Sequence, residues 1–262
     1  MNTSKLESVP RVILWSAPRC ISTAFERSIR TLQDVHVMHE CYCTASYLGK
    51  ERTSQRYKDQ EPIDGFSFNE VKKLLEDNYP GCSAIFMKDM AYSMAGKLHT
   101  LPEGYSHTFL IRNPSKAVSS LYRTISKGNM PEWSSFNLEE VGFCEMWELY
   151  QYVKENFGIQ PVVVDADELL SNPAGMMKAY CEATNLQYKD TMLNWEPENQ
   201  DQWLWEKDWY GTVKGSSGFI VNPGGSAAVS KLDVSSLPDF VQDAISAAQP
   251  YYDKLFNCRL KL

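Results

Sequence analysis

The chain alternates between short apolar runs and segments of helical periodicity. The apolar runs occur at Arg11–Trp15, Val35–His39, Ala84–Lys88, Thr108–Ile111 and Pro161–Val164. The helical segments occur at residues 22–32, 68–78, 115–126, 138–156, 173–183 and 238–255. Strands that are separated by helices pair in parallel, and a parallel sheet is buried on both faces. The pattern therefore predicts a three-layer α/β/α fold with a mainly parallel central sheet.

No linker, repeat or low-complexity segment divides the 262 residues, which predicts a single domain over residues 1–262. With 43% hydrophobic and 23% charged residues, the chain has the composition of an ordinary globular protein. Residues 195–229 differ, because they are rich in Trp, Gly and Ser and lack a regular period. Long segments of this kind are often functional, so we expect a loop at a substrate or nucleotide site.

Charge, cysteine spacing and hydropathy exclude several classes of protein. A net charge of −7 argues against a nucleic-acid-binding protein, although a small anion needs just a local group of cations. The seven Cys and four His residues lack the spacing of a zinc site, which predicts reduced thiols and no metal. The apolar runs are too short to cross a bilayer and no secretory signal is evident, so we expect no membrane partner and a cytoplasmic location. The sequence does not determine an oligomeric state.

The first apolar run leads through a short loop into a helix. This segment reads Val12-Ile-Leu-Trp-Ser-Ala-Pro-Arg-Cys-Ile-Ser-Thr-Ala-Phe25. A helix that begins just after a strand presents unpaired N–H groups and the positive end of its dipole. Arg19, Ser22 and Thr23 add a cation and two hydroxyl groups, so the segment favours a phosphate site. The alternative is that Ser22 or Thr23 simply caps the helix and that Arg19 is solvated.

Three familiar phosphate-binding loops do not match this segment. The nucleoside-triphosphatase loop G-x-x-x-x-G-K-[ST] and the dinucleotide fingerprint G-x-G-x-x-G both need glycines that are absent here. A cysteine-phosphatase loop needs five residues between Cys and Arg, whereas six lie between Cys20 and Arg27. The loop is therefore of another kind.

The loop resembles that of sulfotransferases whose sulfuryl donor is 3′-phosphoadenosine-5′-phosphosulfate. The first strand of that family ends in P-[KR]-S-G-T-T, and here the loop is Pro18-Arg-Cys-Ile-Ser-Thr23. The resemblance implies a P-loop-like fold and a donor phosphosulfate that is held, without a metal, by Arg19, Cys20, Ile21, Ser22 and Thr23. Because Cys20 replaces serine and Ile21 replaces glycine, we expect the first half of this loop to curl less tightly.

A second segment resembles the same family. Sulfotransferases carry R-[ND]-P-x-x-x-x-x-S after a later strand, and this chain has Arg112-Asn-Pro-Ser-Lys-Ala-Val-Ser-Ser120 directly after the fourth apolar run. Pro114 suits a first helical turn, Asn113 suits its cap, and Arg112 offers a bidentate fork. The resemblance implies that Arg112 and Ser120 hold the 3′-phosphate of the donor. The alternative is an ordinary strand-to-helix connection.

Further cations are expected near the nucleotide. Arg123 lies one helical turn after Ser120 and could add charge near the 3′-phosphate, whereas Lys116 is expected in solvent. The segment Lys-Gly-Ser-Ser-Gly-Phe at residues 214–219 stands where these enzymes close a basic loop over the nucleotide. The resemblance implies donor contacts by Lys214, Gly215 and Ser216, and the alternative is a surface turn.

The acceptor must lose a proton, so the site needs a base near its oxygen or nitrogen. Related carbohydrate sulfotransferases place a glutamate base near the end of the second run, which makes Glu40 the first candidate and His39 the second. Cytosolic sulfotransferases carry K-x-H at the end of the third run, with the lysine on the transferring group. Here Lys88 matches, but Met90 stands at the histidine position. Arg19 would stabilise the charge that develops on the leaving group.

Aromatic residues crowd one short segment, at Trp195, Trp203, Trp205, Trp209 and Tyr210. Dense tryptophans outside regular structure often line a pocket, where they bind aromatic groups by stacking or cations by cation–π contacts; the alternative is a satellite core. We expect a small acceptor, namely a phenol, enol, alcohol or amine. The expected acceptor-binding residues are Glu40, Asp89, Tyr92, Trp203 and Trp209. Asp89 could instead orient Lys88.

Together these features predict an enzyme that moves a sulfuryl group from the donor to a hydroxyl or amine of a small, aromatic acceptor by in-line displacement. A small-molecule kinase of P-loop architecture is one alternative, but ATP has no 3′-phosphate for Arg112 and Ser120 to bind. A catalytically silent nucleotide-binding protein is the other alternative, because Met90 stands where a base is expected.

Overall fold

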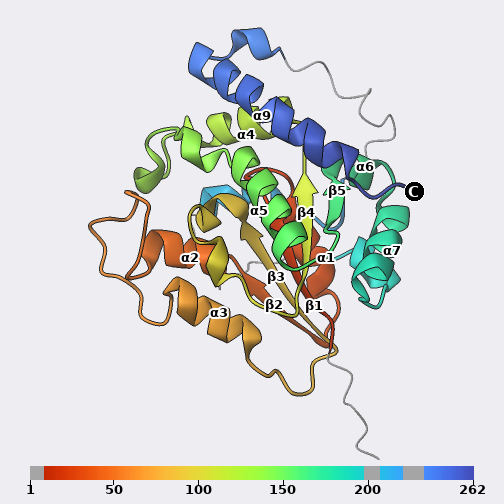
Figure 1. The fold of residues 1–262 in the computed structure, drawn as a ribbon. Coiled ribbons are helices and arrows are strands. Elements are labelled where there is room, and N and C mark those ends of the chain that lie inside the picture. Colours follow the sequence, from red (N-terminus) through yellow and green to blue (C-terminus); the bar gives the residue numbers. More distant parts are fainter. Residues whose placement is uncertain (1–8, 198–206, 221–232) are drawn as a thin grey trace, which may run out of the picture.

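The computed structural model describes residues 9–197, 207–220 and 233–262. Within them, five strands form one parallel sheet in the order β2-β3-β1-β4-β5 (Figure 1). The bounds are β1 Arg11–Ser16, β2 Val35–His39, β3 Ala84–Met90, β4 Ser106–Ile111 and β5 Val162–Asp165. This confirms the α/β fold with a parallel central sheet that the sequence predicts.

Helices cover both faces of this sheet (Figure 1). Their bounds are α1 Ser22–Arg30, α2 Cys41–Leu48, α3 Phe68–Glu76, α4 Pro114–Ile125, α5 Phe143–Asn156, α6 Ala166–Ser171, α7 Pro173–Thr184, α8 Gly211–Lys214 and α9 Asp239–Asn257. The connection from β1 to β2 and the connection from β4 to β5 run in opposite directions along the sheet, so right-handed crossovers place α1 opposite α4 and α5. Helix α9 packs against α4 and α5 and belongs to their layer.

Burial on both faces explains why the strands are continuous apolar runs. Residues Val12–Trp15 of β1 have no exposed surface, because β1 lies at the centre of the sheet between β3 and β4. Trp15 stacks on Tyr42 of α2 with ring centroids 5.9 Å apart. On α1, Phe25 meets Tyr180 of α7 edge to face at 4.8 Å. The core thus extends from the sheet into helices that come from distant parts of the chain.

Several helices differ from the sequence prediction, since the short helices α6 and α8 are also not among the predicted segments, and two of the differences have a clear physical reason. The helix predicted over 138–156 is interrupted, because Gly142 adopts a left-handed φ of 78° and α5 begins after it, preceded by a single 3₁₀ turn at Leu138–Glu140. Helix α2 is not among the predicted elements. All eight of its residues are buried, and an evenly buried helix shows no amphipathic period.

The loops that follow β1, β2, β3 and β4 meet at the carboxyl edge of the sheet. Parallel sheets bind ligands at this edge, where the direction of the connections reverses. Arg19 follows β1, Glu40 follows β2, Met90 ends β3 and Arg112 follows β4. The fold therefore brings both predicted phosphate motifs and both predicted base segments to one place.

Candidate functional site

The loop between β1 and α1 forms a cradle of backbone amides. Arg19 and Ile21 both adopt left-handed conformations, with φ of 67° and 61°, so Ile21 takes up the geometry that a glycine favours and does not straighten the turn. Ile21 is the N-cap of α1, and no side chain bonds the first amides of this helix in the described part of the chain. The capping alternative for Ser22 and Thr23 is therefore wrong. These N–H groups can bind an anion.

The side chain of Cys20 points away from the cradle. Its Sγ lies 3.9 Å from the carbonyl oxygen of Pro18, and the residue has no exposed surface. Burial raises the pKa of this thiol to about 12, so the thiol is neutral. The predicted donor contact of Cys20 therefore falls to its backbone, because its side chain does not line the cavity.

Two guanidinium groups meet beside the cradle. Arg19 donates from Nε to Oγ of Ser120 at 3.1 Å and from Nη1 to the carbonyl of Trp209 at 3.0 Å. Arg112 donates from Nη1 to the carbonyl of Arg19 at 2.9 Å, while its buried Nε has no hydrogen-bond partner among the described residues. Burial, and then the charge of Arg112, lower the pKa of Arg19. Two neighbouring, half-buried cations favour a bound anion.

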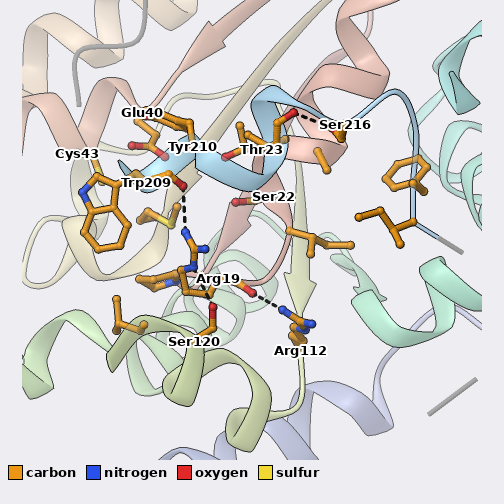
Figure 2. A pocket seen from close by; sticks show the side chains of 18 of the residues that line it. Arg19, Ser22, Thr23, Glu40, Cys43, Arg112, Ser120, Trp209, Tyr210 and Ser216 are labelled. Carbon is orange, nitrogen blue, oxygen red and sulfur yellow. Dashed lines mark hydrogen bonds between the residues drawn. The ribbon is translucent and has the colours of Figure 1, made fainter. Parts of the chain in front are cut away.

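These groups line one end of a cavity of about 420 Å³. In Figure 2, Arg112 and Ser120 lie on one side of the cavity, Glu40 and Tyr210 lie on the opposite side, and Arg19 lies between them. The cavity therefore joins the predicted donor-binding residues to the predicted base.

Glu40 lies in the cavity wall as half of a buried ion pair. Its backbone is left-handed with φ of 50°, its side chain is 9% exposed, and Nζ of the fully buried Lys88 donates to its Oε1. Burial acts to raise the pKa of Glu40, but the charge of Lys88 and the neighbouring His39 outweigh burial and lower that pKa. Likewise, burial acts to lower the pKa of Lys88, but the charges of Glu40 and Glu26 outweigh burial and raise that pKa. Lys88 does not itself line the cavity.

His39 lies behind the cavity wall. Its Nδ1 is 2.5 Å from Oε2 of Glu26, a fully buried residue of α1, and its Nε2 is 3.1 Å from Oη of Tyr210. Nε2 also lies 3.7 Å from Oε1 of Glu40. Tyr210 and Glu40 line the cavity, whereas His39 does not. His39 therefore contacts the cavity-lining residues Tyr210 and Glu40 but does not itself face the cavity.

The two acceptor residues predicted near the end of β3 are separated by the fold. Asp89 is fully buried and accepts the backbone N–H groups of Tyr42 and Cys43, at 2.6 and 3.1 Å, in the first turn of α2. It therefore caps α2 and neither faces the cavity nor orients Lys88, and burial raises its pKa to about 7. Tyr92 does line the cavity. The expectation that Asp89 binds the acceptor is wrong, because the buried first turn of α2 takes up both of its carboxylate oxygens.

The segment that contains α8 covers the cradle. Trp209 and Ser216 line the cavity, but Lys214 and Gly215 do not. The expected donor contacts of the segment therefore reduce to Ser216 in this structure. Trp203 lies outside the described residues.

Arg27 anchors the same segment. The helical period turns Arg27 away from the core, which predicts an exposed side chain, but this residue is 3% exposed. Its guanidinium donates to the carbonyl oxygens of Val213 and Glu196, and its Cζ lies 5.7 Å over the ring of Trp195. The sequence period does not reveal this burial, because the covering segment comes from a distant part of the chain.

The two remaining cations of α4 also differ from expectation. Lys116 is not solvated but pairs with Asp167 of α6 at 2.8 Å, with 15% of its side chain exposed. Arg123 is exposed and does not line the cavity, so its position one turn after Ser120 points it out of the site.

Aromatic residues that the sequence analysis missed complete the cavity wall. Tyr47 comes from α2, and Trp133 ends a 3₁₀ turn at Pro131–Trp133. Trp133 meets Trp209 edge to face at 4.7 Å and lies 5.5 Å from the ring of Tyr47. Because these residues belong to separate elements, no spacing in the sequence indicates that they share a wall.

In the described part of the chain, no group of three or more His, Cys, Asp or Glu residues is arranged to hold a metal ion. Over the same residues, no helix combines the length and the apolar character that a membrane span requires.

Comparison with known proteins agrees with this geometry. The family model of the sulfotransferase domain matches residues 10–255. The chain belongs to the sulfotransferase family. The sulfotransferase domain of the Synechococcus PCC 7002 olefin synthase superposes on this sulfotransferase with a TM-score of 0.55 and 12% identity, covering 95% of this chain and 97% of that one. A sulfotransferase domain from the curacin biosynthetic pathway superposes with a TM-score of 0.50 and 15% identity, covering 93% of this chain and 99% of that one. At these identities the likeness shows the fold.

Curated relatives are longer than this sulfotransferase. Branched-chain-amino-acid aminotransferase-like protein 2 of Arabidopsis thaliana is 29% identical over 213 residues, which are 78% of this chain and 35% of the relative. Sulfotransferase ppzF of Metarhizium majus is 23% identical over 180 residues, which are 59% of this chain and 52% of the relative. The chain therefore spans about a third to a half of the length of these relatives.

Proposed function

We propose that this sulfotransferase moves a sulfuryl group from 3′-phosphoadenosine-5′-phosphosulfate to a hydroxyl or amine of a small, aromatic acceptor. One observation carries the proposal: a single cavity has two half-buried arginines and open helix amides at one end and a carboxylate within aromatic walls at the other. Donor and acceptor can then meet inside one cavity.

The donor end offers a partner for each phosphate. The amides of the cradle, with Arg19, Ser22 and Thr23, suit the 5′-phosphosulfate. The unpaired Nε of Arg112, with the hydroxyl of Ser120, suits a 3′-phosphate. Sulfuryl transfer depends on positioning and on stabilising charge at the leaving phosphate, which Arg19 does from its place between the two ends. These groups supply that stabilisation without a metal ion.

The acceptor end favours small, flat molecules. Tyr47, Tyr92, Trp133 and Trp209 present aromatic rings to a cavity of about 420 Å³, a volume that suits a small molecule. Glu40 lies in the same wall, and His39 stands directly behind it. The acceptor's proton therefore leaves on this side of the cavity.

The donor is tested by the thermal stability of the protein with adenosine 3′,5′-bisphosphate, with ATP and with adenosine 5′-monophosphate. A ligand at about a hundred times its dissociation constant stabilises by about 2.7 kcal/mol, which raises Tm by several degrees. We expect this shift with the bisphosphate. An ATP-selective shift would favour the kinase, and a bisphosphate shift without sulfuryl transfer to any of a panel of phenols and amines would favour the silent nucleotide-binding protein.

A further inference from the structure

A chain of three polar side chains runs from the cavity wall into the core. Tyr210 lines the cavity and is 4% exposed, and its Oη lies 3.1 Å from Nε2 of His39. Nδ1 of His39 lies 2.5 Å from Oε2 of Glu26, which has no exposed surface. Three distant parts of the chain supply these residues: the segment before α8, the end of β2, and α1.

The charge on Glu26 sets the direction of both hydrogen bonds. Burial acts to raise the pKa of Glu26, but His39, which donates a hydrogen bond to it, and the charges of Arg30 and Lys88 outweigh burial and lower that pKa to about 2, so this side chain is a carboxylate. A carboxylate only accepts, hence Nδ1 of His39 carries a proton and donates it. In the neutral imidazole Nε2 is then the acceptor, and Oη–H of Tyr210 donates to it. A phenol oxygen that donates its own proton can accept another from a group in the cavity.

Glu40 is less suited to receive the proton. Its Oε1 already accepts from Lys88, and Lys88 has no exposed surface and stands behind it. If Glu40 were neutralised, the buried ammonium would lose its main counter-charge, which is unfavourable in a low-dielectric site. In contrast, a positive charge on His39 would lie 2.5 Å from one carboxylate and 3.7 Å from another, those of Glu26 and Glu40.

We propose, on the basis of the proposed sulfuryl transfer, that Tyr210 receives the acceptor's proton and relays it to His39. The acceptor oxygen forms a bond to sulfur, and the bond from sulfur to the 5′-phosphate oxygen breaks with its electron pair on the departing adenosine 3′,5′-bisphosphate. The acceptor's proton moves to Oη of Tyr210 as the proton of Tyr210 moves to Nε2 of His39. Glu26 and Glu40 hold the resulting imidazolium, which returns its proton to water by the same route after the products leave.

In this relay, Tyr210 is the catalytic residue, and His39 and Glu26 act through it as positioning residues, in the manner of the second and third members of a hydrolase triad. The arrangement also couples the relay to the donor. Tyr210 directly follows Trp209, whose carbonyl accepts from Arg19 in the cradle. The bond between Arg19 and the Trp209 carbonyl therefore holds the adjacent Tyr210 hydroxyl beside His39.

The test compares two probe acceptors, phenol and 4-nitrophenol, with Tyr210→Phe and radiolabelled 3′-phosphoadenosine-5′-phosphosulfate. Phenol is protonated at mildly alkaline pH and needs a base, whereas 4-nitrophenol is largely ionised there and does not. We expect kcat with phenol to fall about a hundredfold and kcat with 4-nitrophenol to change by about threefold at most. Tyr180→Phe is the matched control, because it also removes a buried tyrosine hydroxyl. That hydroxyl lies 2.9 Å from Oγ1 of Thr108, and neither residue lines the cavity. A loss that is equal for both acceptors, or absent with phenol, would overturn the relay.

Nitrogen-15 NMR of the wild-type protein tests the relay without any acceptor. We expect the neutral imidazole of His39, assigned by its loss in His39→Gln, to carry its proton on Nδ1. Glu26→Gln should move that proton to Nε2 and lower kcat with phenol, while the affinity for adenosine 3′,5′-bisphosphate stays within about twofold. A wild-type proton on Nε2 would overturn the relay alone. A wild-type protein that binds no bisphosphate and transfers to no acceptor would instead overturn the proposed function.

Discussion

Nε of Arg19 lies 3.1 Å from Oγ of Ser120, although 101 positions separate the two residues in the chain. This bond joins the loop after β1 to helix α4, and Arg112 strengthens the junction by donating to the carbonyl of Arg19. The two phosphate motifs therefore belong to one site. A nucleotide with phosphates on both its 3′ and 5′ positions has the chemistry to bridge them.

Arg112→Ala should remove discrimination for the 3′-phosphate. Because a hydrogen bond to a charged group contributes about 1.5–3 kcal/mol, we expect the Kd of adenosine 3′,5′-bisphosphate to rise about 10- to 100-fold. The Kd of adenosine 5′-monophosphate should change by about threefold at most. Calorimetric titration of both nucleotides measures this ratio, with the exposed Arg123→Ala as control. If both nucleotides lose affinity equally, Arg112 acts through the loop and not on the 3′-phosphate.

Arg19→Lys should separate charge from geometry in the cradle. Lysine keeps the positive charge but lacks the planar fork with which Arg19 donates to Ser120 from Nε and to the Trp209 carbonyl from Nη1. We expect kcat for sulfuryl transfer to fall about a hundredfold or more. Arg11→Lys is a suitable control, since Arg11 bonds carbonyls near the end of α3, outside the cavity. Unchanged kcat in Arg19→Lys would show that a point charge is sufficient.

The acid stability of the protein should depend on Glu26. Burial acts to raise the pKa of Glu26, but His39 and Arg30 lower it from the ordinary 4.5 to about 2. A carboxyl with a lowered folded-state pKa stabilises the fold above pH 4.5, and this contribution is lost as pH falls from 4.5 toward 2. We expect the loss to be on the order of 2–3 kcal/mol in free energy of unfolding. Urea titrations across this range should show a shallower dependence in Glu26→Gln, and an identical slope would contradict the assignment.

Trp209→Ala should weaken acceptor binding and spare donor binding. The substitution removes an aromatic wall that meets Trp133 at 4.7 Å, but it keeps the backbone carbonyl that accepts from Arg19. We expect KM for an aromatic acceptor to rise about tenfold, with little change in the Kd of adenosine 3′,5′-bisphosphate. Steady-state kinetics with a phenol series measures the effect. A larger loss in nucleotide affinity than in acceptor KM would place Trp209 in the donor site.

Gly142→Ala should destabilise the fold, because the new methyl group would press on Tyr92 in the cavity wall. Gly142 has φ of 78°, and an added Cβ would lie 3.3 Å from Cδ1 of Tyr92. We expect a loss of about 1–2 kcal/mol, or about 2–4 °C in Tm. Gly158→Ala has a similar φ of 66° with nothing within 4 Å of the new Cβ, so it measures the backbone strain alone. Equal losses in the two variants would show that Tyr92 yields without cost.

The sheet and the two phosphate motifs could be predicted from the sequence. The strands are buried on both faces, so they appear as continuous apolar runs such as Val12–Trp15. The phosphate motifs are also local, since Arg19 and Arg112 each stand directly between a strand and a helix. The sequence pattern gave no correct prediction where a helix or side chain is buried on the side that an amphipathic period would leave exposed. Helix α2 is buried on every side, and Arg27 lies under a segment that begins more than a hundred residues later in the chain.

Which aromatic residues share the cavity wall, and which charged groups surround His39 and Glu40, follows from the tertiary structure and not from the sequence pattern. Tyr47, Trp133 and Trp209 share a wall because separate elements converge there, which no spacing in the chain encodes. Similarly, the sequence does not show that Glu26 lies beside His39 or that Lys88 pairs with Glu40. Whether a side chain acts as a base depends on the charges packed around it, and packing brings together residues that are distant in sequence.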